Sequence, residues 1–153
     1  DRVRDAGASL HTPRDEDAGD LLEFVGRRNP HWRVFYQEFL AAGGLPDVVV
    51  AKEEGGRIVG SSYAMDARAD GRRYDFCAWR ELLGDQIGGV GPLLVDDGSR
   101  ERGIGLALAA RVTEKLKAKG LGTSFVGYTW LADWYGKLGY RTWREYRQSR
   151  RML

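Results

Sequence analysis

The segment spanning residues 93–106 constrains the fold of this chain more than any other part of it. An apolar run ends in a short polar loop, and a helix is predicted to begin beside Gly103 and Gly105. The first amides of a helix lack partners inside the helix, and the helix dipole places partial positive charge there. Glycines let a ligand approach these amides, and Arg100 and Arg102 add cationic donors that suit phosphate oxygens. The segment therefore predicts a strand, a tight loop and a helix start that together bind a pyrophosphate.

Two common nucleotide-binding motifs do not describe this loop. A Walker loop ends in Gly-Lys-Ser/Thr, which this segment lacks. The three-glycine dinucleotide fingerprint would need a glycine where Leu108 stands. Taken alone, Arg-x-x-Gly-x-Gly also fits a surface turn with incidental arginines, so the interpretation depends on the rest of the chain.

Composition fits one folded domain. The chain has 153 residues, 42% of them hydrophobic and 30% charged, so we expect a single domain over residues 1–153. Because the chain starts at Asp1 and not at a methionine, a domain cut from a longer or tandem protein is also compatible with the sequence. One cysteine, Cys77, excludes a four-thiolate zinc site within the chain, and two histidines are too few for a histidine-rich site, so we expect no metal. No apolar run reaches the about 18 residues of a membrane span, and no signal-like segment opens the chain, so we expect a cytoplasmic protein without a membrane partner. Arginine outnumbers lysine 19 to 5, a bias that genomic base composition can produce, and we expect a bacterial-like source.

Charge is unevenly distributed along the chain. Residues 1–99 carry 12 Lys and Arg against 18 Asp and Glu, and residues 100–153 carry 12 against 4, so a net −6 precedes a net +8. The basic last third predicts an anionic partner, and the acidic part is compatible with a cationic one. Nucleic acid is not the expected partner, because no nucleic-acid module accompanies the arginines between Arg141 and Arg151. These arginines also fit a solvated strand face and tail.

Hydrophobic periodicity predicts a mixed α/β order without internal repeats. Residues 66–87 give no clear pattern, and Pro92 is expected to bulge or break the strand that contains it. The expected elements are a strand at 8–10, helices at 12–29 and 32–40, a hairpin of strands at 48–53 and 57–65, a strand at 88–95, a helix at 103–119, a strand at 123–130, a helix at 133–138 and a strand at 142–150.

A second motif follows the glycine loop after about 30 residues. Arg100-x-x-Gly103-x-Gly105 resembles the acetyl-coenzyme A signature of the GNAT N-acetyltransferase superfamily. Trp134-Tyr135-x-Lys137-Leu138-Gly139-Tyr140 is similar to the later aromatic-Tyr-x-Lys-Leu-Gly-aromatic motif of that family. The opening Thr12-Pro13-x-Asp15 also resembles the family's usual start, and the element order matches over nearly the whole chain.

The resemblance implies a GNAT-like three-layer α/β (mixed α+β) domain whose central sheet splays apart. The pantetheine arm of acetyl-CoA would lie in the V between the fourth and fifth strands, and residues 100–106 would hold the pyrophosphate. Lys137 could reach an adenosine-side phosphate, or be solvated on its helix. The implied cofactor-binding residues are Leu93, Leu94, Val95, Arg100, Glu101, Arg102, Gly103, Ile104, Gly105, Leu106 and Lys137.

The resemblance also implies catalytic roles. Tyr135 matches the family's general acid, and its reference pKa of about 10 keeps it protonated beside a thiol leaving group with a pKa of about 8.5. The N–H of Leu93 or Leu94 would polarise the thioester carbonyl. An acceptor ammonium with a pKa of about 10.4 needs help to lose its proton. Glu81 and Asp85, and also Asp66, are tentative bases, although a solvated surface acid is the simpler interpretation of each.

The expected activity is therefore transfer of an acetyl group from acetyl-CoA to a primary amine, by direct attack in a ternary complex. The acceptor is a small molecule or a peptide, and a homodimer is compatible with the sequence. The alternative is a non-catalytic GNAT-like module that binds acyl-CoA, or one half of a tandem protein. Asp97, Ser99 and Tyr128 depart from the family's common proline, aromatic residue and asparagine. Trp130 and Trp134 are expected to pack in the core, and the alternative is that they line an acceptor pocket.

Overall fold

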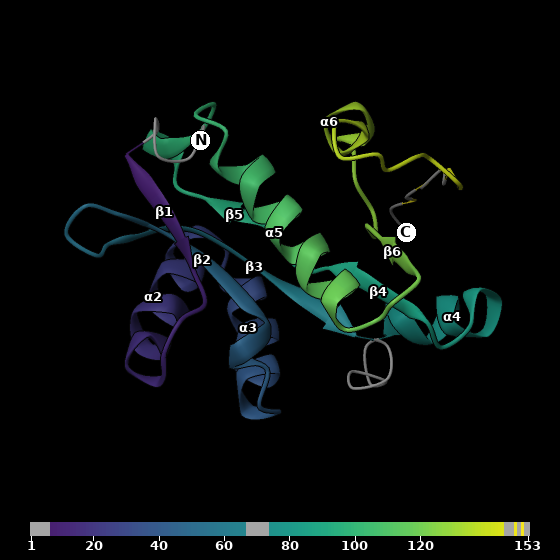
Figure 1. Cartoon of the computed structure of the whole chain (residues 1–153), viewed down its shortest axis with the longest axis horizontal. Coiled ribbons are helices and arrows are strands. Elements are labelled where there is room, and N and C mark those ends of the chain that lie inside the picture. Colours follow the sequence, from purple (N-terminus) through teal and green to yellow (C-terminus); the bar gives the residue numbers. More distant parts are fainter. Residues whose placement is uncertain (1–6, 67–73, 146–148, 150, 152–153) are drawn as a thin grey trace.

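A six-stranded mixed sheet forms the centre of the computed structural model, which describes residues 7–66, 74–145, 149 and 151 (Figure 1). Along the sheet, the strands follow the order β1-β2-β3-β4-β6, and β5 also pairs with β3. All pairs are antiparallel except β4 with β6, which is parallel. The strands are β1 (Ala8–His11), β2 (Val48–Glu53), β3 (Ile58–Asp66), β4 (Ile87–Val90), β5 (Leu94–Val95) and β6 (Thr123–Phe125).

Helices cover both faces of this sheet (Figure 1). α2 (Ala18–Arg28) and α3 (Pro30–Ala41) pack on one face, where Val48 and Val50 of β2 join their buried side chains. α5 (Ile104–Ala118) packs on the other face, where Val49 and Ala51 point. The alternation follows from the two-residue period of a strand, and it confirms the expected three layers. No helix within the described ranges is long and apolar enough to span a bilayer.

Local sequence signals explain where the helices begin. The side chain of Asn29 accepts hydrogen bonds from the amides of His31 (3.1 Å) and Trp32 (3.3 Å), which caps α3, and Pro30 occupies its first turn. The first helix begins later than the Thr12-Pro13 signal predicted. A short 3₁₀ turn, η1 (Asp15–Asp17), precedes α2 instead.

The strand around Pro92 contains one extra residue relative to β3. β4 ends with Val90 opposite Ala64, and β5 begins with Leu94 opposite Ser61. Two residues of β3 therefore stand opposite the three residues 91–93, which defines a β-bulge. The bulge expected at Pro92 is confirmed, and proline suits it because its nitrogen carries no hydrogen for the ladder.

The sheet opens on the far side of this bulge. β6 pairs with β4 only from Ile87 opposite Thr123 to Gly89 opposite Phe125. The chain then leaves the sheet and reaches α6 (Ala132–Gly136), so the strand expected to run to residue 130 stops at Phe125. The resulting gap corresponds to the splayed sheet that the resemblance implied.

Two further expectations differ from the structure. The unpatterned segment contains α4 (Tyr74–Leu83). The strand expected at 142–150 is wrong over residues 142–145, which form no strand, and residues 146–148 and 150 lie outside the described residues. Instead, the Trp143 ring meets Trp79 of α4 edge to face at 4.9 Å, and the Arg144 guanidinium lies 5.3 Å from both ring centres. The alternating Trp and Arg side chains therefore serve a packing contact rather than a strand pair.

Replacing Gly91 by alanine should destabilise the protein by about 1–3 kcal/mol, the usual cost of overpacking. A Cβ atom there would lie 2.7 Å from the ring of Tyr63 and 2.9 Å from its carbonyl oxygen. Gly98→Ala is the matched control, because no atom lies within 4 Å of its Cβ position. Denaturant unfolding of both variants checks the prediction, which equal stabilities would contradict.

Candidate active site

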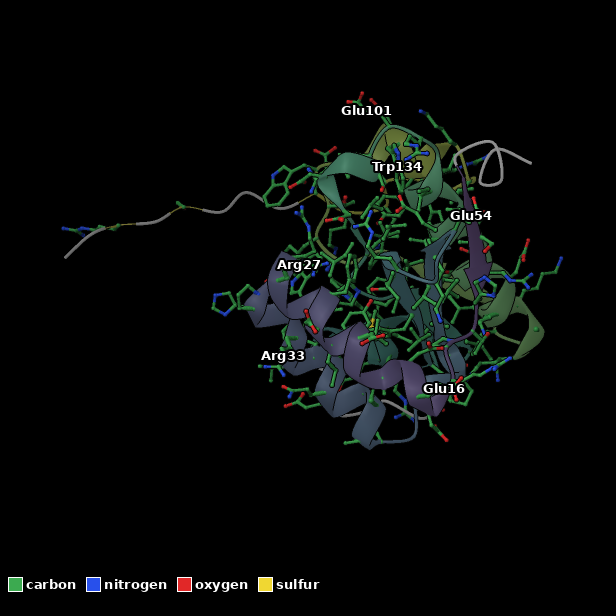
Figure 2. The ribbon with its side chains drawn as sticks, turned by 90° about the vertical axis from the view of Figure 1, so that its left-hand side faces the viewer. Glu16, Arg27, Arg33, Glu54, Glu101 and Trp134 are labelled. Carbon is green, nitrogen blue, oxygen red and sulfur yellow. The ribbon has the colours of Figure 1, made fainter. Side chains whose placement is uncertain are left out.

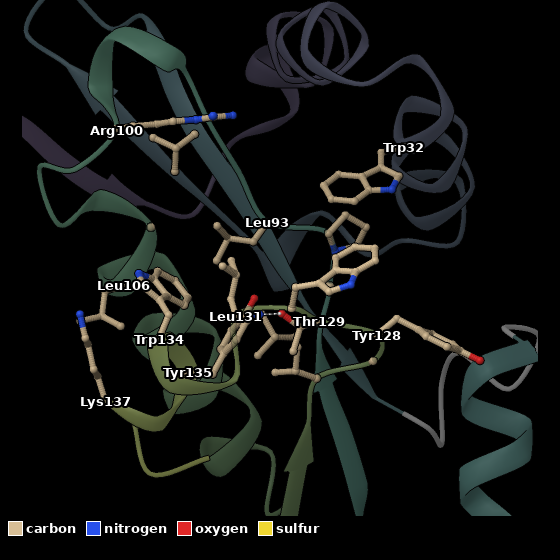
Figure 3. A pocket seen from close by; sticks show the side chains of 18 of the residues that line it. Trp32, Leu93, Arg100, Leu106, Tyr128, Thr129, Leu131, Trp134, Tyr135 and Lys137 are labelled. Atoms are coloured by element: carbon tan, nitrogen blue, oxygen red, sulfur yellow. Dashed lines mark hydrogen bonds between the residues drawn. The ribbon is translucent and has the colours of Figure 1, made fainter. Parts of the chain in front are cut away.

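A pocket of about 1330 Å³ occupies the gap between the bulged strand and the chain that follows β6. Figure 3 shows Arg100, Leu106 and Lys137 at one end, Trp32 at the other, and Leu93 and Tyr135 between them. The pocket therefore joins the two sequence motifs, which lie about 30 residues apart in the chain.

The first end of the pocket is the loop between β5 and α5. Gly103 caps α5 with a left-handed φ of 82°, which favours glycine because it has no Cβ. A Cβ on Gly105 would lie 3.3 Å from Trp134, so the indole packs directly on the helix start. Figure 2 shows Glu101 and Trp134 at the same end of the molecule. Of the residues predicted to hold the pyrophosphate, all line the pocket except Ile104, the first residue of α5, whose side chain is buried in the core.

An ion-pair network shapes this loop. Arg28 at the end of α2 donates two hydrogen bonds to the carboxylate of Asp97, at 2.6 and 2.5 Å. Arg100 also contacts this carboxylate at 3.1 Å. Hydrogen bonding from Arg28 is the largest effect on the Asp97 carboxyl and lowers its pKa below the ordinary value. Desolvation opposes it, and the nearby charges of Arg100 and Arg28 lower the pKa further. Sequence reasoning missed Arg28, because nothing local connects it to a carboxylate 69 residues later.

Two amides, those of Leu93 and Leu94, were predicted to polarise a carbonyl, and they point in different directions. Asp96 N donates to Val59 O at 2.8 Å. Because an antiparallel ladder alternates its direction residue by residue, the amide of Leu94 faces β3 and the amide of Leu93 faces away from it. Within the described residues, no main-chain carbonyl accepts from Leu93 N–H. Leu93 lines the pocket and the Leu94 side chain is buried, so the geometry favours Leu93.

Tyr135 stands on α6 beside Leu93 (Figure 3). Its ring is buried edge to face against Trp134 (4.8 Å) and Tyr140 (5.8 Å). Burial raises the pKa of the Tyr135 phenol above its usual value, and Tyr140 adds to the effect. The Tyr140 hydroxyl is itself fixed by Thr113 (2.9 Å) and Ser124 (2.7 Å). Within the described part of the chain, no group hydrogen-bonds the Tyr135 hydroxyl, which leaves it free for a ligand.

The structure does not bring the tentative bases to the pocket. Glu81 and Asp85 are exposed and do not line it, and hydrogen bonding from Arg80 lowers the pKa of Asp85. Asp66 is buried at the end of β3 and also lies outside the lining. Among the described residues, Glu101 is the one carboxylate of the lining, and no cluster of side chains suits a metal ion.

The second end of the pocket is aromatic. Trp32 and Phe35 of α3 line it together with Tyr128 and Trp130 from the chain after β6. The expectation that Trp130 packs in the core is wrong, because this residue is 96% exposed, whereas Trp134 is half-buried against Gly105. Sequence reasoning placed Trp32 and Phe35 only within the helix expected at 32–40 and gave them no role in a site, whereas in the structure both line the pocket.

Comparison with known proteins adds to this geometry. No family model and no curated protein matches the chain. A solved fungal multi-domain GH3 β-N-acetylglucosaminidase contains a GCN5-related glucosamine N-acetyltransferase region that matches 94% of this chain, with a TM-score of 0.82 and 28% identity. The chain spans 17% of the length of that fungal protein.

Solved acetyltransferases match at lower identity. A GNAT family acetyltransferase from Brucella melitensis, in complex with acetyl-CoA, matches 89% of this chain and 84% of its own, with a TM-score of 0.63 and 18% identity. Glucosamine-6-phosphate N-acetyltransferase from Arabidopsis thaliana matches 95% and 99%, with a TM-score of 0.60 and 16% identity. The chain therefore has the GNAT fold, as its two motifs predicted.

The contact between Arg28 and Asp97 gives a pH-dependent prediction. Because the folded state lowers the pKa of Asp97 below 3.8, the pair stabilises the protein above that value, and the stabilisation is lost as the pH falls through the folded-state pKa. Arg28→Leu should therefore lower the free energy of unfolding near pH 7 but not at about pH 2.

Denaturant unfolding at several pH values, with an NMR titration of the Asp97 carboxyl, measures this effect. Arg27→Leu is the control, since its partner Glu23 lies 3.9 Å away on an exposed surface. A stability difference that is the same at both pH values, or an Asp97 pKa that Arg28→Leu leaves unchanged, would contradict the prediction.

Proposed function

We propose that this chain transfers an acetyl group from acetyl-CoA to a primary amine. One observation carries the proposal: a single pocket joins the glycine-flanked start of α5, the unpaired N–H of Leu93 and the free hydroxyl of Tyr135. These three groups suit three different parts of a thioester cofactor, namely its phosphates, its carbonyl oxygen and its sulfur. The GNAT neighbours solved with acetyl-CoA and with CoA support the same assignment.

The pocket residues fit the cofactor along its length. At the phosphate end, the amides of residues 100–106 and the charges of Arg100, Arg102 and Lys137 would hold the pyrophosphate and the further phosphate. Gly103 and Gly105 place no side chain over the main chain there, and at Gly105 a Cβ would also meet the Trp134 ring. The outward amides of Leu93 and Val95 would pair with the pantetheine arm as a strand edge does.

The chemistry follows from these positions. The amine nitrogen attacks the thioester carbonyl carbon and forms a C–N bond, and the carbonyl oxygen gains negative charge that Leu93 N–H stabilises. The C–S bond then breaks, and Tyr135 donates its proton to the departing sulfur. Burial keeps the phenol protonated well above neutral pH. With Glu81 and Asp85 outside the pocket, we assign removal of the amine protons to water, which passes one of them to the Tyr135 phenolate and the other to the solvent.

An amino sugar is the acceptor that we propose. The aromatic rings of Trp32, Phe35 and Trp130 line the pocket, and Figure 3 shows Trp32 at the end opposite Arg100 and Lys137. Such rings suit the apolar C–H face of a sugar, whose hydroxyl groups remain directed toward water. Two of the structural neighbours are named for glucosamine and glucosamine-6-phosphate, which supports this class over lysine side chains, protein N-termini or other small amines.

Tyr135→Phe should lower kcat by roughly 10²- to 10⁴-fold, because the variant cannot donate a proton to the sulfur. The affinity for acetyl-CoA should be unchanged, since the ring is retained. Thiol release with glucosamine as acceptor gives kcat, and calorimetry gives the affinity. Tyr140→Phe is the matched control, which loses contacts with Thr113 and Ser124 and hence stability, but not the proton donor.

Two outcomes would contradict the proposed reaction. A wild-type kcat retained in Tyr135→Phe would remove this residue from the acid role. Tight acetyl-CoA binding without thiol release across a broad panel of amines would instead favour the non-catalytic acyl-CoA-binding module.

Trp130→Ala tests the acceptor class. Loss of one stacking contact, worth about 1 kcal/mol, should raise the KM for glucosamine about fivefold without changing the affinity for acetyl-CoA. Trp143→Ala is the control, because this exposed indole packs on α4 and does not line the pocket. The amino-sugar proposal fails if wild-type protein prefers a lysine peptide to glucosamine, or if Trp130→Ala leaves the KM unchanged.

A further inference from the structure

A buried tyrosine hydroxyl lies directly behind the bulge. Tyr36 of α3 is fully buried, and its hydroxyl donates to the carbonyl oxygen of Pro92 at 3.0 Å. The Tyr36 hydroxyl oxygen also lies 2.9 Å from Ser61 Oγ. A phenol carries one hydrogen, so Ser61 donates to Tyr36 and Tyr36 donates to Pro92. Burial also raises the pKa of Tyr36, so its hydroxyl keeps the proton that this chain requires.

The carbonyl that Tyr36 holds belongs to the same peptide unit as the N–H of Leu93. A trans peptide is planar, and its C=O and N–H point in opposite directions. Fixing the Pro92 oxygen toward Tyr36 therefore fixes the Leu93 hydrogen on the side away from Tyr36. A hydrogen bond to the carbonyl also polarises the peptide, which makes the N–H a better donor.

We propose that Tyr36 is a positioning residue that aims the N–H of Leu93 at the thioester carbonyl. The inference rests on the proposed function, because it requires an acyl-CoA in the pocket. Tyr36 lies behind the strand and does not line the pocket, so it acts through the Pro92–Leu93 peptide. The Ser61 hydroxyl strengthens the effect, since chains of hydrogen bonds polarise one another.

The ring and the hydroxyl of Tyr36 have separable roles. The ring packs edge to face against Tyr63 at 4.9 Å, within the core beneath α2 and α3. This packing is retained in Tyr36→Phe, which removes only the hydroxyl. A purely structural tyrosine would therefore lose stability in this variant without any change in how the protein recognises an acetyl group.

The neighbouring peptide of the bulge supplies a matched control. Ser62 Oγ donates to the carbonyl oxygen of Gly91 at 3.2 Å. This carbonyl belongs to the Gly91–Pro92 peptide, whose nitrogen carries no hydrogen. Ser62→Ala therefore removes a buried hydrogen bond from the same bulge, yet it frees no peptide that could present a donor to the pocket.

The experiment compares the affinities for acetyl-CoA and for CoA, measured by calorimetry on the full chain. Only acetyl-CoA carries the carbonyl oxygen, so the ratio of the two affinities reports on the Leu93 contact. In Tyr36→Phe this ratio should fall about three- to tenfold, the usual effect of one hydrogen bond, while CoA affinity is retained. In Ser62→Ala the ratio should stay at the wild-type value. The Leu93 amide proton should shift in NMR spectra when acetyl-CoA replaces CoA, and this shift should shrink in Tyr36→Phe.

Each outcome decides between the two proposals. An unchanged affinity ratio and an unchanged Leu93 shift in Tyr36→Phe would overturn the role of Tyr36 and leave the acetyltransferase proposal standing. Wild-type protein that binds neither acetyl-CoA nor CoA would overturn both. If Tyr36→Phe does not fold, the double variant Y36F/S61A removes the orphaned Ser61 hydroxyl as well, and it must show the same fall in the affinity ratio.

Discussion

One extra residue in the strand opposite β3 separates the two halves of the sheet. Before the bulge, β4 holds β6 in a parallel pair that ends at Gly89 and Phe125. After it, β5 returns to β3 in a register shifted by one residue, and the chain beyond Phe125 turns away toward α6. The pocket lies in the space that this divergence opens, and Leu93 reaches it because it belongs to the bulge. The phosphate loop then begins one short strand later.

The two ends of the pocket differ in the charge of the residues that line them. The excess of basic residues in the last third of the chain includes Arg100, Arg102 and Lys137, which all line the phosphate end. Among the residues that the structure describes, carboxylates of the acidic part do not line the pocket. Several of them hold cations within the fold, as Asp17 does with Lys52 at 2.5 Å and Asp97 with Arg28. Part of the basic excess therefore lies where we propose that an anion binds, and several carboxylates of the acidic part form ion pairs within the fold.

Local patterns predicted most of the fold, and contacts between distant segments account for what they missed. The hairpin, α5 and the bulge at Pro92 all follow from residues close together in the chain, and the prediction of a phosphate-binding loop at residues 100–106 rests on the same kind of local pattern. Arg28 and Asp97 are separated by 69 residues, and Tyr36 and Pro92 by 56, so no local pattern connects them. Alternation predicted a strand beyond residue 142, but Trp143 finds a ring partner on α4 instead of a strand partner. The exposure of Trp130 likewise depends on where β6 ends.

Main-chain groups make several of the contacts that we propose for this pocket, and this affects how far the amino-acid sequence can change during evolution. The amide of Leu93 and the first amides of α5 would be present with many side chains at those positions, provided that the bulge and the glycine turn persist. Selection on such groups acts on backbone shape and leaves much of the amino-acid sequence free to drift. A chain of this kind can diverge until no family model matches it, while solved structures still superpose on it over 94% of its length.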